Sequence, residues 1–405
     1  MTEQMNVPKL RFGEFNEALA RKTLEEVAEK IQDGTHFSPP LDEEGTCLYL
    51  TSKNIRNGFM LLEDISYISE LEHKKIYKRC DVKRGDVLLT KDGASTGNCC
   101  INTLDSEFSL LSSVAFIRAD ANHHNNFIYQ SIASQAGQKL IRGAISGQAI
   151  TRITLTKLRN FKFYFPTLPE QQKIASFLSK VDEKIALLSE KKDKLTEYKK
   201  GVMQHLFNGS FQERDGQLTF IPPTLRFKAD DGSEFPDWEE VTLGELCNIT
   251  TGKLDANAMV AGGEYRFYTC AKEHYQIDKY AFDTEALLIS GNGANVGYIH
   301  YYNGKFNAYQ RTYVLDSFNS SHIHFVKCFL DRNLKKRIMQ EKNDGNTPYI
   351  VLSTLKDMKV LLPNKQEQAL IANFLSTIDK KIDLVNSELE KAKEWKKGLL
   401  QQMFV

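Results

Sequence analysis

Residues 170–207 and residues 367–404 are two copies of one helical sequence, separated by 197 positions. They align without a gap and are identical at 18 of 38 positions. Amphipathicity alone would match only the apolar positions, yet several identities are charged or polar. These are Asp182 and Asp379, Lys184 and Lys381, Glu197 and Glu394, and Gln204 and Gln401. Shared ancestry explains the matches better, so the chain is predicted to be an internal duplication.

Apolar residues recur at heptad spacing in both copies, which is the pattern of a coiled coil. The two rows of the first copy are Ile174, Val181, Leu188, Leu195 and Val202, then Leu178, Ile185 and Leu206; those of the second are Ile371, Ile378, Val385, Ala392 and Leu399, then Leu375, Ile382, Leu389 and Met403. Lys192, Lys199 and Lys396 interrupt the seam, and we expect their amines to bend to solvent. Roughly 36 helical residues make a rod of about 54 Å, which suits a spacer.

The duplication extends beyond the helices. Residues 8–12 (PKLRF) are matched by residues 223–227 (PTLRF), and the Thr-Leu pair at 23–24 is matched at 242–243. A Gly-Ala-x-x-Gly loop follows an apolar run at 93–97 and again at 293–297. Apolar positions also correspond just before each helix, from Ile153 to Phe165 and from Ile350 to Leu362. Between these fixed points the two interiors look unrelated, as expected for two recognition surfaces on one scaffold.

The repeat predicts an α+β protein with an approximate two-fold axis. Two globular domains of mixed α/β structure would be held apart by two long antiparallel coiled-coil helices, giving a dumbbell. The predicted boundaries are residues 1–165 for the first lead-in and domain, 166–210 for the central helix, 211–363 for the second lead-in and domain, and 364–405 for the C-terminal helix.

Composition limits the class of protein. With 405 residues, 41% of them hydrophobic, each half can bury its own core. No apolar run approaches the roughly 20 residues of a membrane span, so a soluble, cytoplasmic protein is expected. The seven cysteines form no C-x-x-C pair, which favours reduced thiols, with Cys99 and Cys100 packed in a strand. His123, His124, His322 and His324 lack acidic or cysteine partners at ligand spacing, so no metal site is expected.

The net charge of only +1 argues against non-specific coating of nucleic acid, but it leaves room for local basic patches. One basic cluster contains Lys74, Lys75, Lys78, Arg79, Lys83 and Arg84, and another contains Lys335, Lys336 and Arg337. Each cluster is compatible with phosphate contact or with a solvated helix face.

Motifs for catalysis are missing from the sequence. An amino-methyltransferase acting on DNA needs an N/D-P-P-Y/F motif, but neither Pro39-Pro40 nor Pro222-Pro223 has the flanking residues. No Gly-x-x-x-x-Gly-Lys-Ser/Thr loop for a nucleotide phosphate is present. The chain is therefore predicted to be non-catalytic and to hold no cofactor of its own.

The repeated L-P-x-x-x-Q-x-x-I-A-x-F-L-type helix after two divergent domains resembles the specificity subunit of a type I restriction-modification system. The residues that carry the resemblance are Leu168, Pro169, Glu170, Gln171, Gln172, Ile174, Ala175, Phe177, Leu178 and Asp182, with Ile371, Ala372, Phe374, Leu375 and Asp379 in the second copy. One departure is that residues 364–366 separate Leu362-Pro363 from Glu367. The start of the second helix is therefore expected to be shifted.

The resemblance implies a DNA-binding subunit that recognises a bipartite target in double-stranded DNA. Each domain would read one half-site, and the helices would set the unread gap between them. It also implies two methylation subunits that use S-adenosylmethionine and two restriction subunits that use ATP and Mg²⁺. A non-catalytic adaptor that binds proteins, or a self-sufficient modification enzyme, are the alternatives from other classes; the adaptor would show no salt-dependent binding of duplex DNA.

Side chains that match base edges are candidates for DNA contact: Arg or Lys for guanine, Asn or Gln for adenine, and Thr for thymine. In the first domain they are Thr35, His36, Thr51, Lys53, Asn54, Arg56, Lys91, Ser95, Thr96, Asn98, Arg142, Ser146 and Gln148. In the second domain they are Thr251, Lys253, Lys272, His274, Asn292, Asn295, Tyr309, Gln310, Arg311, Asn343, Asn346 and Tyr349. Outward helix positions predicted to bind the methylation subunits are Glu170, Gln171, Gln204, Glu367, Gln368 and Gln401.

Overall fold

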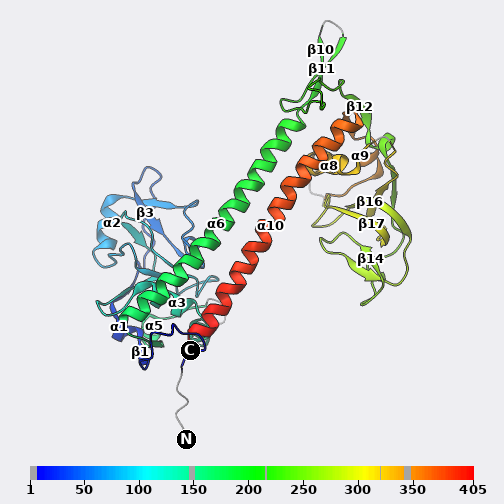
Figure 1. Ribbon diagram of the computed structural model, residues 1–405. Helices are drawn as coiled ribbons and strands as arrows, with labels where there is room; N and C mark the ends of the chain where they lie inside the picture. Colours follow the sequence, from blue (N-terminus) through cyan, green and yellow to red (C-terminus); the bar gives the residue numbers. More distant parts are fainter. Residues whose placement is uncertain (1–6, 146–150, 215–216, 320, 342–347) are drawn as a thin grey trace. The chain divides into compact units, whose positions relative to one another are not determined.

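The computed structural model describes residues 7–145, 151–214, 217–319, 321–341 and 348–405. The chain divides into two compact units, one of residues 1–190 and 386–405 and the other of residues 191–385. Each unit contains one globular domain of helices and strands together with parts of both long helices (Figure 1). The predicted α+β class with two mixed domains and a repeated helix is confirmed.

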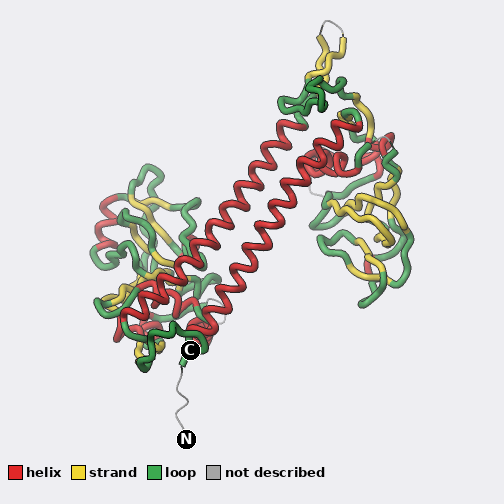
Figure 2. Tube along the Cα trace, in the orientation of Figure 1, coloured by secondary structure: helices red, strands yellow, loops and turns green. Residues whose placement is uncertain are grey.

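The first globular domain contains short strands and helices in the order β1 (Ala20–Thr23), α1 (Leu24–Val27), β2 (Ala28–Asp33), β3 (Cys47–Leu50), η1 (Ser52–Asn54), β4 (Ser66–Ile68), α2 (Glu70–Tyr77), β5 (Val87–Thr90), β6 (Cys99–Ile101), β7 (Phe108–Leu110), β8 (Val114–Ala119), α3 (Asn125–Ala133), α4 (Gln135–Ala144), α5 (Leu155–Arg159) and β9 (Lys162–Phe165). Its strands, which are yellow in Figure 2, form sheets in the orders β2-β8-β5-β6, β4-β3-β7 and β1-β9.

The second unit has a hairpin of β10 (Ser210–Arg214) and β11 (Gln217–Ile221), followed by the globular domain. That domain contains β12 (Glu239–Thr242), α7 (Leu243–Leu246), β13 (Asn248–Thr251), η2 (Ala256–Ala258), β14 (Tyr265–Tyr268), β15 (Tyr275–Ile277), β16 (Phe282–Ser290), β17 (Ile299–Ala308), β18 (Thr312–Asp316), α8 (Ile323–Glu341), α9 (Leu352–Lys356) and β19 (Lys359–Leu362). Its main sheet has the order β13-β18-β16-β17-β14-β15, and β12 pairs with β19.

The two domains share one strand order although their interiors look unrelated in sequence. Strand β17 pairs with β16 through its first part and with β14 through its last part. In the first domain, two separate strands take these roles: β6 pairs with β5, and β7 pairs in parallel with β3. Residues 102–107 interrupt what is one continuous strand in the second domain, so the first domain has two sheets in place of one.

The long helices are α6 (Leu168–Leu206) and α10 (Lys365–Met403), each of 39 residues. Their starts are 197 positions apart, so the predicted shift of the second helix is wrong. The reason is that Pro363 corresponds to Pro166, and not to Pro169. The side-chain amide of Gln171 donates to the Pro166 carbonyl at 2.8 Å, and that of Gln368 donates to the Pro363 carbonyl at 2.7 Å.

The two helices run antiparallel within each unit (Figure 1), and the predicted seam positions that lie nearest the domains are buried. In the first unit Lys396 pairs with Asp182 at 2.5 Å, and in the second Lys199 pairs with Asp379 at 2.6 Å. The two lysines are 197 positions apart, and so are the two aspartates. The same ion pair is therefore present in both units. The expectation that these two lysines bend to solvent is wrong, because the repeat places an aspartate opposite each amine.

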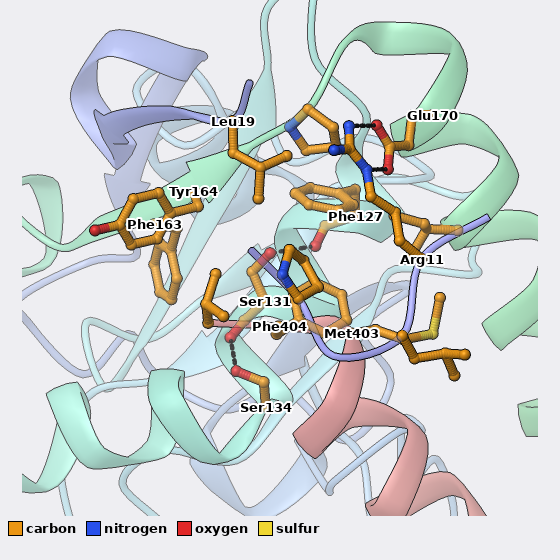
Figure 3. Close-up of a pocket in the computed structure, with 15 residues that line it drawn as sticks. Arg11, Leu19, Phe127, Ser131, Ser134, Phe163, Tyr164, Glu170, Met403 and Phe404 are labelled. Atoms are coloured by element: carbon orange, nitrogen blue, oxygen red, sulfur yellow. Dashed lines mark hydrogen bonds and ion pairs between the residues drawn. The ribbon is translucent and has the colours of Figure 1, made fainter. Parts of the chain in front are cut away.

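The lead-in segments, residues 8–12 and 223–227, attach to the long helices by equivalent contacts. Arg11 donates twice to the Glu170 carboxylate, at 2.6 and 2.7 Å (Figure 3), and Arg226 donates twice to Glu367, at 2.9 and 3.0 Å. Phe12 packs edge-on against Phe177, as does the equivalent pair in the second unit. The hydrogen bond to its carboxylate partner is the main reason that the pKa of each arginine is raised.

Candidate nucleic-acid interface

In the second unit, five chain segments are joined by hydrogen bonds into one loop rim. These segments are residues 252–255, 270–274, 291–295, 309–311 and 349–350. The amide of Gly252 donates to the Thr312 carbonyl, that of Gly291 donates to the Arg311 carbonyl, and that of Ile350 donates to the Gly291 carbonyl. The Asn295 side chain donates to the Cys270 carbonyl at 3.1 Å and connects the remaining loop. The polar positions predicted from the sequence are therefore held on one frame.

The first unit repeats this frame with residues 34–37, 51–56, 91–98, 111–113 and 151–153. The amide of Gly34 donates to the Val114 carbonyl, that of Lys91 donates to the Ser113 carbonyl, and that of Ile153 donates to the Lys91 carbonyl. Each of these bonds has its counterpart in the second unit. The two rims therefore have the same pattern of backbone hydrogen bonds but carry different side chains.

Two glycines are needed for this frame, and sequence reasoning gave them no role. A Cβ at Gly34 would lie 1.9 Å from the Leu110 carbonyl oxygen, and one at Gly252 would lie 1.9 Å from that of Ala308. Any side chain would therefore push the first loop of the rim away from its neighbour. Aligning the residues that follow β2 and β13 would have found the pair.

In the second rim, the predicted residues are mainly accessible. Lys253, Lys272, His274, Gln310, Arg311 and Tyr349 are exposed, and Thr251, Asn292, Asn295 and Tyr309 are half-buried. The Gln310 amide donates to Asp255 at 2.8 Å, which orients it along the loop. This rim offers cationic, amide and aromatic groups together, the groups that contact base edges and phosphates.

In the first rim, the predicted residues divide into surface groups and internal supports. His36 is exposed, Thr51, Lys53, Arg56, Ser95, Thr96 and Asn98 are half-buried, and Arg142 is exposed on α4. Thr35, Asn54 and Lys91 are buried instead. Asn54 donates to the Leu61 and Asp64 carbonyls, both at 3.0 Å, and the Lys91 amine lies 2.9 Å from Asp92. These three side chains support the loops from inside.

Four predicted residues, Ser146, Gln148, Asn343 and Asn346, lie outside the described residues. Two rim residues were missed by sequence reasoning, namely Ser113 and Arg152. They take the positions of Arg311 and Tyr349 in the second rim, at offsets of 198 and 197. Arg152 is exposed and its guanidinium lies 3.4 Å from Asp92. Extending the repeat alignment through the loops would have identified both.

The basic clusters are largely compensated by neighbouring acids. Lys74 pairs with Glu70 and Lys75 with Glu72, both at 2.6 Å, along the exposed face of α2. Arg337 pairs with Glu341 on α8, also at 2.6 Å. Such i,i+3 and i,i+4 pairs are typical of a solvated helix face. Arg79 differs, because it donates to the buried carboxylate of Asp33 beneath the first rim.

The predicted outward face of the long helices needs correction. Glu170, Gln171, Glu367 and Gln368 are buried, at 0 to 1% exposure, so the expectation that they face outward is wrong. The glutamates hold the lead-in arginines, while each glutamine accepts a backbone amide of the globular domain, from His124 at 3.1 Å and His322 at 2.7 Å. Their identity in both copies thus reflects internal attachment. Gln204 and Gln401 are exposed, as expected.

Within the described residues, no helix is long and apolar enough to cross a membrane. The described His, Cys, Asp and Glu side chains include no group of three placed to hold a metal ion. All seven cysteines are free. Cys99 and Cys100 are buried in strand β6, which confirms the predicted packing in a strand. Burial raises the pKa of the Cys99 thiol to about 12, so its thiolate is scarce at neutral pH.

The sequence model of one protein family, described as "Type I restriction modification DNA specificity domain", matches the chain twice, over residues 16–197 and 236–394. The chain belongs to this family. Its role is therefore DNA sequence specificity within a type I restriction-modification system, as the non-catalytic component. The two matched regions each contain one loop rim and the start of the long helix that follows it. Membership leaves the adaptor hypothesis without support.

Relatives agree with this assignment. The EcoDI specificity subunit of Escherichia coli is 44% identical over 155 residues, which cover 38% of this chain and 34% of that protein. This match thus spans about a third of that relative's length. The MjaVIII specificity subunit of Methanocaldococcus jannaschii is 23% identical, and the match covers 88% of this chain and 85% of the relative.

Solved structures support the fold. The chain is similar to a type I restriction-modification S subunit from M. genitalium, with a TM-score of 0.65 and 19% identity over 98% of this chain and 99% of the other. A chain from a study of complex assembly in a type I system has a TM-score of 0.52 and 15% identity, covering 96% and 98%. At these identities the likeness concerns the fold.

Proposed function

We propose that each loop rim reads one half of a bipartite target in double-stranded DNA. The observation that carries the proposal is that the rims share a hydrogen-bonded backbone but present different side chains. Ser113 and Arg152 in the first rim stand where Arg311 and Tyr349 stand in the second. A common frame with different polar groups suits two readers of different base sequences. The exposed members of the two predicted sets are the proposed base and phosphate contacts.

The long helices set the gap between the half-sites in this proposal, and their outward faces bind the methylation subunits. Exposed apolar residues recur at equivalent positions of both helices: Leu187 and Leu384 are 58% and 61% exposed, and Tyr198 and Trp395 are 55% and 50% exposed. Within each helix the two residues are 11 positions apart and share a face. Gln204 and Gln401 are also exposed, but they lie about 120° around each helix from Tyr198 and Trp395. Two equivalent surfaces, one on each helix, suit two copies of the same partner.

The catalytic chemistry belongs to the partners in this proposal. Two methylation subunits would supply S-adenosylmethionine, and two restriction subunits would supply the sites for ATP and Mg²⁺. The complex would work in the cytoplasm, where its DNA target lies.

The test is to co-express the chain with the methylation subunit encoded beside it in a host without adenine methylation, and to map N6-methyladenine by long-read sequencing. We expect one bipartite motif with a fixed gap. Arg311→Ala should relax the motif in one half only, since a bidentate arginine contact discriminates bases by about 1–3 kcal/mol.

Arg152→Ala should relax the other half. Lys228→Ala, at an exposed position directly after the second lead-in, is the matched control and should leave the motif unchanged. The proposal fails if a stable complex produces no new methylation, or if each arginine variant alters both halves equally.

A further inference from the structure

A buried lysine lies beneath the first rim, between two carboxylates. Lys91 is 2% exposed, and its amine lies 2.9 Å from Asp92 Oδ2 and 3.5 Å from Asp33 Oδ2. Asp33 is also buried, while Asp92 is half-buried. An isolated charge in such a place is strongly disfavoured, so the amine and the two carboxylates depend on one another. We call these three side chains the ionic cluster.

Two arginines are attached to the ionic cluster, one at each carboxylate. Arg79 donates to Asp33 Oδ1 at 2.8 Å and to the Gly34 carbonyl at 3.1 Å, where the first loop of the rim begins. Arg152 Nε lies 3.4 Å from Asp92 Oδ1. The side chains of the two arginines are 53% and 56% exposed. Each carboxylate thus holds a guanidinium group that reaches the surface of the rim.

The lysine makes this part of the rim positive. Lys91, Arg79 and Arg152 carry three positive charges against the two carboxylates. The exposed imidazole of His36 also faces Asp33, at 3.3 Å. Without the lysine, the two carboxylates would cancel the two guanidinium charges. The buried amine therefore lets the carboxylates orient the arginines without neutralising them.

The second rim is supported by neutral groups instead. The residues in the positions of Asp33, Lys91 and Asp92 are Thr251, Gly291 and Asn292. Ala115, which is opposite Asp33 in the sheet, corresponds to Tyr313. A Cβ at Gly291 would lie 3.1 Å from the Tyr313 ring, which thus takes the space of the lysine side chain, and its hydroxyl donates to a backbone carbonyl at 3.0 Å. The ionic cluster therefore belongs to the first rim.

Arg79 lies in a segment that has no counterpart in the second unit. It follows helix α2, which lies between strands β4 and β5. The corresponding strands of the second unit, β15 and β16, are joined directly by residues 278–281. The first rim therefore has an additional arginine, supplied by an insertion and held by a buried carboxylate.

We propose that the ionic cluster positions two arginines for DNA recognition. Arg79 and Arg152 contact guanine in the half-site that the first rim reads. The inference rests on the proposed function, and it adds Arg79 to the reading residues. A guanidinium group matches the O6 and N7 acceptors of guanine, and a fixed orientation is what makes that contact selective. Buried carboxylates behind the guanidinium groups supply this orientation.

The test substitutes each carboxylate by its amide in the methylation mapping of the proposed function. Lys91 keeps one carboxylate partner in either variant, so we expect both to fold. Asp92→Asn should relax the motif at the position that Arg152→Ala relaxes. Asp33→Asn should relax it at the position that Arg79→Ala relaxes. Both positions should be guanines of one half-site, and sites with another base there should be methylated about tenfold more often than by the wild type.

A double variant distinguishes positioning from general support. Because a positioning residue acts through the arginine that it holds, Asp92→Asn combined with Arg152→Ala should have the motif of Arg152→Ala alone. Additive relaxation in the double variant overturns the proposal, and so does relaxation of both half-sites by either amide variant.

Asp86→Asn is the matched control for lost stability. Asp86 is buried in the same domain and accepts from Arg118 at 2.8 and 3.0 Å, at the opposite end of strand β5 from Lys91. We expect its thermal midpoint to fall at least as far as those of the amide variants, with an unchanged motif. A motif relaxed to the same extent by Asp86→Asn would show that lost stability causes the effect, and it would overturn the proposal.

A second variant gives the first rim the neutral support of the second, and it decides the matter if an amide variant does not fold. It combines Asp33→Thr, Lys91→Gly, Asp92→Asn and Ala115→Tyr, so that a ring fills the space of the lysine. Both arginines remain, but they lose their carboxylates. We expect relaxation at both guanine positions, and a folded variant that keeps the wild-type motif contradicts the proposal.

Contact with a base and contact with a phosphate give different results. If Arg79→Ala lowers methylation equally at all sites and flattens the salt dependence of duplex binding, this arginine contacts phosphate, and its assignment to guanine is wrong. Failure of the proposed function is seen separately, as a wild-type complex that assembles but leaves the host DNA unmethylated. The inference alone fails if the wild type methylates a bipartite motif with no guanine at the relaxed positions.

Discussion

At the scale of single residues, three half-buried histidines connect stability to pH. Desolvation by partial burial lowers the pKa of His124, of His300 and of His324, so each binds a proton less readily in the folded chain. In the unfolded chain the same side chains take up protons as the pH falls through about 6.5. The unfolded state then binds more protons than the folded state, and the free energy of unfolding decreases on acidification.

We therefore expect the thermal midpoint to fall as the pH is lowered from 7.5 to 5.5, before the carboxylates titrate. His300→Gln retains a donor for the Ala271 carbonyl, which the imidazole contacts at 3.0 Å, and should make the decrease shallower. Differential scanning calorimetry across this range measures the effect. His36→Gln, at an exposed position of the first rim, is the control, and an equally shallow profile for both variants would contradict the explanation.

The limits of sequence reasoning are visible at the same scale. Repetition of Glu170 and Gln171 in both copies predicts a surface for partners, but in the structure these side chains bind other parts of the same chain. A sequence pattern reports that a position is constrained, while the atoms that constrain it are distant in the chain, at Arg11 and His124. Likewise, nothing in the sequence distinguishes Lys91, which is buried against Asp33 and Asp92, from the half-buried Lys53.

At the scale of elements, the proposed function makes the gap between half-sites adjustable, because the paired helices would set it. Inserting one heptad after Glu190 and one after Ser387, its equivalent, preserves the apolar seam in both helices. Each insertion adds about 10 Å at 1.5 Å per residue, or roughly three base pairs of B-form DNA. We expect the methylation motif to keep both half-sites and to gain about three unread base pairs.

Methylation mapping of the lengthened chain measures the gap directly. Insertions of five residues at the same two positions serve as the comparison, because they rotate the following helix by about 140° and break the seam. These should abolish methylation. An unchanged gap in the heptad variant would mean that the helices do not set the spacing.

At the scale of the whole chain, the sequence predicted more of the framework than of the domains. The apolar heptads and the repeated lead-in are local patterns, and they located both long helices and the α+β class. The shared strand order could not be predicted from the sequence, because strand pairing joins distant segments and tolerates any side chain with the right burial. The frame of the rims could not be predicted either, because it consists of backbone hydrogen bonds between distant segments. One example is the bond from the Gly34 amide to the Val114 carbonyl.

The duplication also predicts that the order of the two halves is interchangeable. In the second unit, the amide of Leu225 donates to the His205 carbonyl at 3.2 Å, where a helix end and a lead-in belong to one continuous segment. In the first unit, the amide of Leu10 donates to the Gln402 carbonyl at 3.0 Å between the two ends of the chain. The same junction is thus made with and without a covalent connection.

A circular permutant follows from this equivalence. Val405 is joined to Val7 through a copy of residues 209–221, because Val405 corresponds to Asn208 and Val7 to Pro222, and new ends are opened between Arg214 and Gln217. Because both junctions keep their hydrogen bonds, we expect the permutant to fold with a thermal midpoint within a few degrees of the original and to direct methylation to the same motif. A second permutant, opened between Leu288 and Ile289 inside the buried strand β16, should not fold, since new charged ends cannot be buried there. If the first permutant also fails to fold, the two junctions are not equivalent, and the connection through residues 207–224 has a role that the ends of the chain do not reproduce.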